Sequence, residues 1–161
     1  PQDGSRQPCP GAMTHRVRVA VRGLLMREDR LLVVNAWPTE VSDLWCAPGG
    51  GVEPHTSLPE NLVREMKEET GLEVTVGPPV LVNEFHDPER GFHQVDVYFR
   101  VTAADATLDL GWTDPEGIVT ERRFVTRDEL AGLRVKPSSL AAVAWGDADA
   151  PAYDPLKPIL R

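Results

Sequence analysis

The stretch from Pro59 to Gly71 constrains the fold most, because its residue spacing predicts a single amphipathic helix. Proline is favoured in the first turn of a helix, and glycine is favoured just after its end. At about 100° of rotation per residue, apolar side chains fall on one face and three glutamates fall on the adjoining arc. The apolar face carries Leu62, Val63 and Met66, and the acidic arc carries Glu65, Glu68 and Glu69. Such a helix must bury its apolar side against other elements of the fold.

The acidic arc concentrates like charge, because Glu65 is spaced i,i+3 from Glu68 and i,i+4 from Glu69. Each such pair destabilises a helix by about 0.2–0.5 kcal/mol unless something neutralises it. One interpretation is a solvated surface, on which Arg64 and Lys67 offset part of the charge. The other is a bound divalent cation, Mg²⁺ or Mn²⁺, since both prefer carboxylate oxygens. The helix alone leaves both interpretations open.

Strand-like segments flank this helix on both sides. Before it, a β-hairpin turning at Glu28 and Asp29 and a short strand entering a glycine loop are expected over residues 16–26, 30–37 and 44–51. After it, strands are expected over residues 72–76, 80–85, 93–101 and, as the last one, 117–125. Thr126 is expected to cap a short helix, and Pro137 to begin another over 137–145. This order predicts an α/β (α+β) sandwich with a mixed central sheet.

Composition limits the size of the fold and its partners. A chain of 161 residues with 41% hydrophobic and 26% charged residues suits one globular domain. The formal net charge of -8 argues against binding a nucleic-acid polymer, so any phosphate-bearing partner needs local cations. No apolar run approaches the roughly 20 residues that span a bilayer, so no membrane partner is expected. The two cysteines, Cys9 and Cys46, suggest neither a disulfide framework nor a zinc site and favour a reducing cytoplasm.

The two ends of the chain differ from the part between them. Residues 1–14 show no hydrophobic period and are interpreted as a disordered leader or a remnant of cloning, with Met13 a candidate native start. Residues 147–161 are rich in Pro and Asp and are expected to form an irregular tail. A single domain is therefore expected over residues 15–146.

A glycine loop precedes the acidic helix, and the two together carry a family resemblance. Three glycines from Gly49 to Gly51 at a strand end permit positive φ and close approach of another group to the backbone. From Gly50 to Leu72 the chain resembles the box of the Nudix hydrolase (MutT-like) family, G-x5-E-x7-R-E-U-x-E-E-x-G-U, where U is a bulky aliphatic residue. The resemblance implies a Nudix-type α/β/α sandwich around a mixed sheet.

The box departs from the family pattern at its first glutamate, where this chain has Thr56, and at His55, where a glycine is common. In the family that glutamate supports the helix arginine, here Arg64. Glu53, Glu60 and Glu68 lie near Arg64 in the sequence, and we expect them to take over this supporting role.

The resemblance also implies which residues do the chemistry. It assigns Glu65, Glu68 and Glu69, with the backbone carbonyl of Gly49, to Mg²⁺ or Mn²⁺. It assigns catalytic roles to Glu65 and Arg64, and some family members carry a further catalytic or metal-binding glutamate outside the box, for which Glu116 is our candidate. The implied reaction is hydrolysis of a phosphoanhydride bond in a nucleoside diphosphate linked to another moiety, with a carboxylate accepting the proton of the attacking water.

The box does not identify the substrate, because the recognising residues of the family lie outside it. Four tryptophans are candidate stacking surfaces, and Trp112 is preferred because its surroundings are typical of a loop. Arg90, between His86 and His93, is a candidate phosphate contact, although roles as turn residues and satisfied strand histidines are the favoured explanation of these three residues. A homodimer is expected only because dimers are common among similar proteins.

Two classes of function therefore stay open. The first is a metal-dependent pyrophosphohydrolase acting on a nucleoside triphosphate, ADP-ribose or a nucleotide sugar, which the intact set Glu65, Glu68 and Glu69 favours. The second is a non-catalytic nucleotide-binding or regulatory module of the same fold, which Thr56 favours.

Overall fold

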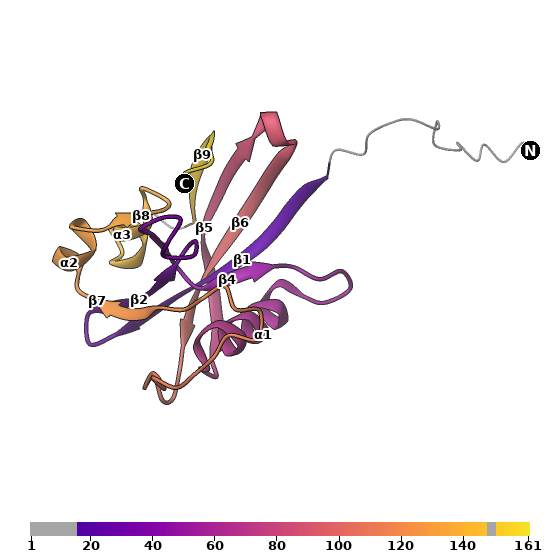
Figure 1. Ribbon diagram of the computed structural model, residues 1–161. Coiled ribbons are helices and arrows are strands. Elements are labelled where there is room, and N and C mark those ends of the chain that lie inside the picture. The colour runs from indigo at the N-terminus through magenta and orange to yellow at the C-terminus, as the bar shows by residue number, and fades with distance from the viewer. Residues whose placement is uncertain (1–15, 148–150) are drawn as a thin grey trace, which may run out of the picture.

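The computed structural model describes residues 16–147 and 151–161, so the expected leader over residues 1–14 lies outside the described residues. Within this part of the chain, four strands come before the first helix, and Figure 1 shows how the elements follow one another. The strands are β1 (Val17–Arg27), β2 (Arg30–Asn35), β3 (Leu44–Cys46), β4 (Gly49–Gly51), β5 (Thr75–Asp87), β6 (Phe92–Thr102), β7 (Arg122–Val125), β8 (Arg134–Val135) and β9 (Ala152–Pro158). The helices are α1 (Leu58–Thr70), α2 (Arg127–Ala131) and α3 (Leu140–Ala144), with a 3-10 turn η1 (Pro88–Arg90).

The strands form one mixed sheet, which confirms the predicted fold class. Its order is β8-β3-β2-β1-β6-β5-β9, with β4 paired to β1 and β7 paired to β2. Three neighbouring pairs are parallel: β1 with β6, β3 with β8 and β5 with β9. The other pairs are antiparallel, including the predicted hairpin of β1 and β2, whose turn residues Glu28 and Asp29 have positive φ.

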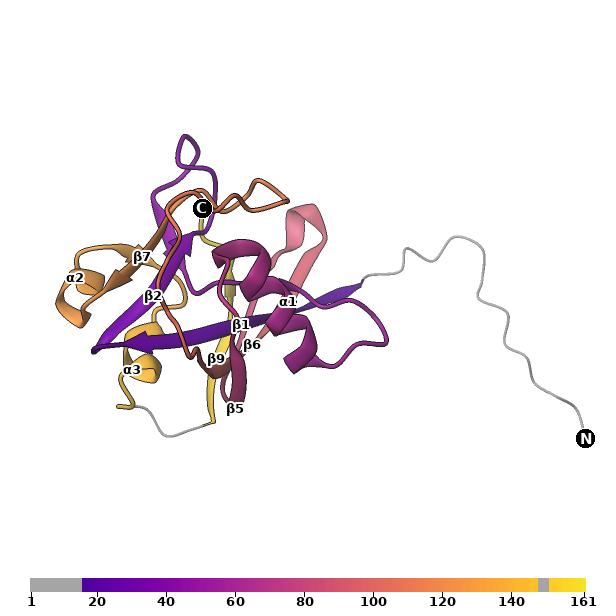
Figure 2. The same ribbon diagram turned by 90° about the horizontal axis from the view of Figure 1, so that it is seen from below.

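Helices cover both faces of this sheet. Successive side chains of a strand point to opposite faces, so neighbouring residues of β1 join different clusters. On one face, Val21 and Leu25 of β1 pack with Leu62 and Met66 of α1. On the other face, Leu24 of β1 joins a second cluster that contains Leu130 of α2 and Leu140 and Val143 of α3. Figures 1 and 2 show α1 lying apart from α2 and α3. The arrangement is the predicted α/β/α sandwich.

The ends of α1 match the sequence prediction. Pro59 lies in its first turn, and Gly71 follows it with a φ of 75° and an N–H that donates to the carbonyl of Lys67. Ser57 caps the start, since its hydroxyl accepts from the N–H of Glu60 while Glu60 accepts from the N–H of Ser57. Gly71 is further constrained because a Cβ there would lie 2.7 Å from the ring of Trp112.

Strand predictions after α1 need two corrections. Residues 75–87 form one strand, β5, and the expected break at residues 77–79 is a register shift within it. Pairing of β5 with β9 begins only at Leu81, so Pro78 and Pro79 lie on an open edge, where proline is tolerated. The strand expected over 117–125 begins only at Arg122 and is not the last, since β8 and β9 follow it.

Two predictions for the C-terminal part were also wrong. Helix α3 begins after Ser139 rather than at Pro137, which precedes it. The expected irregular tail contains β9, which pairs in parallel with the free edge of β5 from Leu81 to His86. Its prolines are tolerated because β9 is an edge strand, and Asp154 is buried where it accepts hydrogen bonds from Ser139 and Lys157. Among the described residues, no helix is both long and apolar enough to cross a membrane.

Candidate functional site

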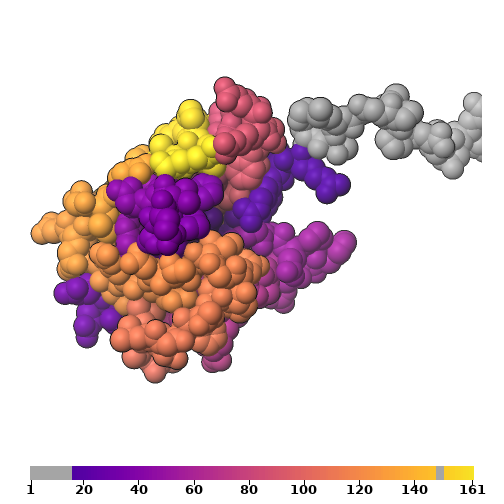
Figure 3. All heavy atoms as spheres, viewed as in Figure 1, coloured from indigo at the N-terminus to yellow at the C-terminus, as the bar shows by residue number. Residues whose placement is uncertain are grey.

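The acidic arc of α1 faces a cavity of about 350 Å³ that lies beside the glycine loop. Because Leu62 and Met66 are buried against the sheet, the helix turns Glu65 and Glu69 toward β4. Both glutamates line the cavity, and Glu116 reaches it from the loop between β6 and β7. Figure 3 shows that the segments around residues 40 and 116 lie next to each other on one face of the molecule. Three of the predicted acidic residues therefore share one cavity.

The glycine loop brings backbone atoms within direct reach of these carboxylates. The N–H of Gly49 donates to Oε2 of Glu69 across 2.9 Å. A Cβ on Gly49 would lie 1.9 Å from the carbonyl oxygen of Val21, and a Cβ on Gly50 would lie 2.5 Å from Oε2 of Glu65. Gly49 therefore requires glycine, because its close neighbour is backbone, whereas a side chain at Gly50 would displace the carboxylate of Glu65.

Arg64 is held by several partners despite the replacement at Thr56. Its guanidinium donates to Oε1 of Glu65 at 3.0 Å and lies 3.7 Å from Glu53 and 3.6 Å from Glu68. Glu53 and Glu68 therefore take the predicted supporting role. Glu60 does not, because its carboxylate caps the start of α1.

Asn61 is the supporting residue that sequence reasoning missed. It is fully buried, and its Oδ1 accepts hydrogen bonds from Arg64 at 3.0 Å and from the N–H of Glu53 at 2.9 Å. Its Nδ2 donates to the carbonyls of Thr56 and Ser57. Asn61 thus ties Arg64 to the loop that contains Thr56.

The loop that presents Glu116 is fixed by two buried polar side chains. The carboxylate of Asp114 accepts hydrogen bonds from the N–H groups of Glu116, Ile118 and Val119, at 3.0, 3.2 and 2.9 Å. Asn35, at the end of β2, accepts from the N–H groups of residues 120 and 121 and donates to the carbonyl of Ile118. These contacts hold an irregular segment in place beside the cavity.

Burial raises the pKa of both helix glutamates that line the cavity. The pKa of Glu69 rises to about 7, because burial outweighs the opposing effects of Arg22 and the Gly49 N–H. Burial likewise raises the pKa of Glu65, although Arg64 opposes it, and Glu68 and Glu116 raise it further. A carboxylate in this position lacks a sufficient countercharge from the protein, so an added cation would favour its ionised form.

The cavity also has the local cations that an anionic substrate needs. Arg18, Arg22, Arg64 and Lys136 all line it. Arg22 donates to the carbonyl oxygens of Ala47 and Gly49, at 3.4 and 3.2 Å, and lies 3.8 Å from Asp96. The carbonyl that the family resemblance assigns to metal is therefore already in contact with a cation.

The donor set of the acidic arc fits a hard divalent cation. Oε2 of Glu68 is buried without a hydrogen-bond partner among the described residues, although Arg64 lies 3.6 Å away. An orphaned carboxylate oxygen of this kind is what a cation would satisfy. Across residues 16–147 and 151–161, however, no three His, Cys, Asp or Glu side chains converge as a ready-made metal cage. In this structure Glu65 contacts Arg64 and Glu69 contacts the N–H of Gly49.

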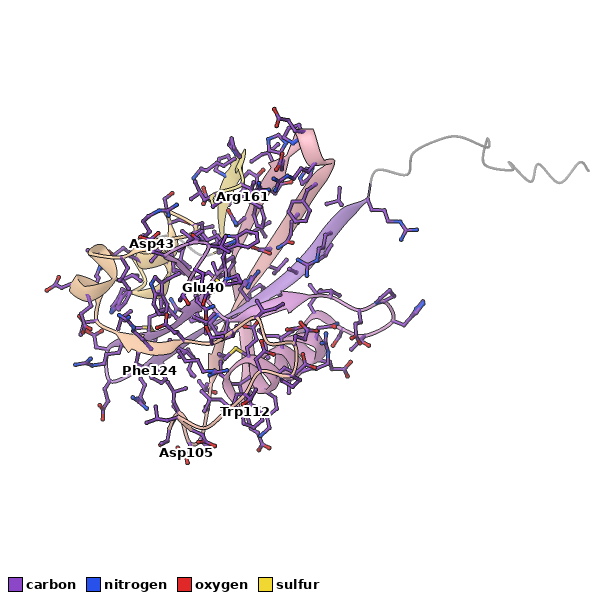
Figure 4. The ribbon with its side chains drawn as sticks, viewed as in Figure 1. Glu40, Asp43, Asp105, Trp112, Phe124 and Arg161 are labelled. Atoms are coloured by element: carbon purple, nitrogen blue, oxygen red, sulfur yellow. The ribbon has the colours of Figure 1, made fainter. Side chains whose placement is uncertain are left out.

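Two of the predicted substrate residues lie away from the cavity. Trp112 packs on the end of α1, where its Nε1 donates to the carbonyl of Glu68 at 2.9 Å, and Figure 4 shows it beside that helix. Arg90 lies in η1 at the tip of the β5–β6 hairpin and pairs with Asp87. Trp37 is the tryptophan that lines the cavity instead.

Comparison with known proteins identifies the family of this domain. A model of the NUDIX domain matches residues 14–145. An ADP-ribose pyrophosphatase of Methanocaldococcus jannaschii is 29% identical over 93 residues, which cover 58% of this chain and 55% of that protein. A CTP pyrophosphohydrolase of Escherichia coli K12 is 31% identical over 101 residues, which cover 60% of this chain and 75% of that protein. The chain spans about half the length of the first relatives it matches.

Solved structures show the same fold. A NUDIX hydrolase from Nitrosomonas europaea superposes with a TM-score of 0.66 at 17% sequence identity, covering 84% of this chain and 92% of that one. At this identity the likeness concerns the fold alone, whereas the domain match spans most of the sequence, including the glycine loop and α1. The chain belongs to the Nudix family.

Proposed function

We propose that this chain is a divalent-metal-dependent pyrophosphohydrolase that cleaves a phosphoanhydride bond in a nucleoside diphosphate linked to another moiety. The observation that carries the proposal is the single cavity in which Glu65, Glu69 and Glu116 face Arg18 and Arg22. Carboxylates and cations that line one cavity suit a substrate that is itself anionic and must be attacked by water. Relatives named for ADP-ribose and CTP hydrolysis support the same class of reaction.

Glu65, Glu68 and Glu69, with the carbonyl of Gly49, are the residues that would hold Mg²⁺ or Mn²⁺. The buried, unpartnered Oε2 of Glu68 and the raised pKa of Glu69 support this assignment. When bound, such an ion neutralises charge on the diphosphate and lowers the pKa of bound water. We expect the ion to compete with Arg64 for the carboxylates, because Arg64 now contacts two of them.

The chain's own residues position the reactants. Arg64 holds the carboxylate of Glu65, and the Gly49 N–H holds that of Glu69, so both are fixed before substrate arrives. Arg18 and Arg22 attract the phosphate groups. As the water oxygen bonds to phosphorus and the bridging P–O bond breaks, a carboxylate accepts the water's proton. Glu116 is our candidate for that base, since it lies on a loop outside the metal-binding arc, and Glu65 is the alternative.

A non-catalytic nucleotide-binding module is the second candidate, because Thr56 replaces a family glutamate. The contacts of Arg64 with Glu53 and Asn61 weaken this alternative, since they supply support that Thr56 does not. A cytoplasmic location and a homodimer both stay predictions.

The direct test is release of phosphate or nucleotide in Mg²⁺ and then Mn²⁺, compared with EDTA. The panel contains nucleoside triphosphates including oxidised ones, ADP-ribose, nucleotide sugars and dinucleoside polyphosphates. We expect metal-dependent turnover of at least one class, with CTP and ADP-ribose tried first. Thermal stabilisation by nucleotides without turnover of any would instead establish the binding module.

A further inference from the structure

Two hydrogen-bond donors at one end of the cavity have no acceptor among the described residues. Nε1 of Trp37 is buried and unpartnered. The ammonium of Lys136 lies 5.4 Å from the centre of the Trp37 ring and 5.1 Å from that of the Phe85 ring. Within residues 16–147 and 151–161, the Lys136 side chain makes only these ring contacts and no ion pair or hydrogen bond. This pair is outside the Nudix box and has no role in the chemistry proposed above.

The fold fixes both donors at the cavity wall. The carbonyl of Trp37 accepts a hydrogen bond from Asn35 at 3.0 Å, so the residue is held at the end of β2. The N–H of Lys136 donates to the carbonyl of Trp45 at 3.0 Å, which continues the pairing of β8 with β3. Both side chains line the cavity that contains Glu65 and Glu69. They are therefore placed to meet the same substrate as the carboxylates.

Burial makes the unpartnered Nε1 of Trp37 unfavourable, whereas Lys136, which is only partly buried, brings a charged donor that has no ion pair among the described residues. A buried N–H without an acceptor loses the hydrogen bond that water would give it. Burial lowers the pKa of Lys136, which shows that its charge is not fully compensated, although the two ring faces attract it. Phe85, Ile118 and Ile159 add apolar wall beside the donors, which suits a planar or partly apolar group.

We propose that Lys136 and Trp37 form a specificity subsite that binds an oxygen acceptor of the substrate. Two sources of oxygen share this chemistry: a carbonyl oxygen of a nucleobase and an anionic oxygen of a phosphate. Adenine offers no carbonyl oxygen, whereas cytosine, uracil and guanine do. The role of the subsite in catalysis rests on the proposed function, but binding of a ligand to the subsite can be measured without turnover.

The test is calorimetric titration in EDTA with CMP, UMP, GMP, AMP and ribose 5-phosphate, followed by KM and kcat on the substrates that turn over. The variants are Lys136→Met and Trp37→Phe, which remove one donor each while keeping much of the packing. Lys67→Met is the matched control, because Lys67 also lies over a tryptophan ring, 5.3 Å from that of Trp112, but outside the cavity. Lys136→Arg tests whether the charge alone restores binding, and thermal melts confirm that each variant is folded.

We expect Lys136→Met to weaken binding about tenfold or more, and Trp37→Phe to weaken it severalfold, with KM rising and kcat little changed. Lys67→Met should match the wild type. Loss confined to CMP, UMP and GMP identifies a base carbonyl as the acceptor, whereas equal loss for AMP and ribose 5-phosphate identifies an anionic oxygen.

Equal affinities and KM values for wild type and Lys136→Met would overturn the subsite, as would a wild type that binds none of these ligands and turns over nothing. Metal-dependent turnover that neither Lys136→Met nor Trp37→Phe changes would support the proposed hydrolase and refute the subsite. Conversely, binding that depends on Lys136 without any turnover would support the subsite and refute the hydrolase.

Discussion

The backbone N–H of Gly49 donates a hydrogen bond to the carboxylate of Glu69 across 2.9 Å, joining the glycine loop to the acidic face of α1. This contact is possible because Gly49 has a φ of 151° and no side chain, so the strand can pass against Val21. The loop and the helix therefore act as one unit in which backbone geometry sets the position of a carboxylate.

Activity that depends on the position of Arg64 should survive a glutamate at position 56 but not the loss of Asn61. We expect Thr56→Glu to preserve or raise kcat/KM, because it adds a carboxylate where the family has one. Asn61→Ala should lower kcat/KM and reduce the free energy of unfolding by about 2–4 kcal/mol, because it removes four hydrogen bonds from a buried site. Urea denaturation and initial rates measure both effects. A clear loss in Thr56→Glu, or a silent Asn61→Ala, would contradict this view of Arg64.

Asp114 should control the position of Glu116 without touching substrate. Asp114→Asn puts an amide where three backbone N–H groups need an acceptor, so we expect a loss of about 1–3 kcal/mol in stability. Its kcat should fall toward that of Glu116→Gln. Asp109→Asn is the control, because Asp109 accepts from the N–H of Gly111 in an exposed turn outside the cavity. If Asp114→Asn keeps full activity, then the Glu116 loop does not need this anchor.

Stability of the metal-free protein should depend on pH through Glu69. The folded pKa of about 7 lies above the ordinary value of 4.5, so the folded chain holds a proton that the unfolded chain has released. This contribution is fully present below about pH 4.5 and is lost as the pH rises through about 7. In EDTA, we expect the wild type to lose about 1–3 kcal/mol relative to Glu69→Gln between pH 5 and 8. Urea melts across this range measure the difference, and a difference that grows with pH in the wild type's favour would refute the assignment.

His55 should be a position where glycine stabilises the protein. His55 has a φ of 68°, in the left-handed region that side chains with a Cβ disfavour. We expect His55→Gly to raise the free energy of unfolding by about 0.5–1 kcal/mol. His55→Ala retains the Cβ and serves as the control, with no comparable gain expected. Equal midpoints for both variants in urea would show that the backbone at His55 is not strained.

The sequence predicts the local features of this protein well, because helix ends and turns depend on near neighbours. The limits set by Pro59 and Gly71, the turn at Glu28 and Asp29, and the cap at Thr126 all match. The prediction of an irregular C-terminal tail was wrong because the structure of this segment depends on a partner that is distant in the sequence. Strand β9 exists because the edge of β5 is free to pair with it, and a Pro-rich segment gives no local sign of such a partner.

Within the site, the sequence predicted the contacts of Arg64 with Glu53 and Glu68 but not those made by three buried polar side chains. Asn61, Asn35 and Asp114 are single polar side chains whose importance comes from burial and from hydrogen bonds to backbone groups, which no residue spacing reveals. Likewise, the sequence does not reveal that Trp37 lines the cavity and Trp112 does not, because loop-like surroundings do not distinguish a ring packed on Gly71 from a ring in the cavity.

The most direct test of the account compares Glu69→Gln with the wild type in Mg²⁺ on the best substrate of the panel. Glu73→Gln is the matched control, since Glu73 is an exposed glutamate just beyond α1. We predict that Glu69→Gln loses turnover by about 10²–10⁴-fold while circular dichroism shows an intact fold, and that Glu73→Gln keeps wild-type turnover. Near-normal, metal-dependent turnover in Glu69→Gln would contradict the assignment of this cavity as the hydrolytic site.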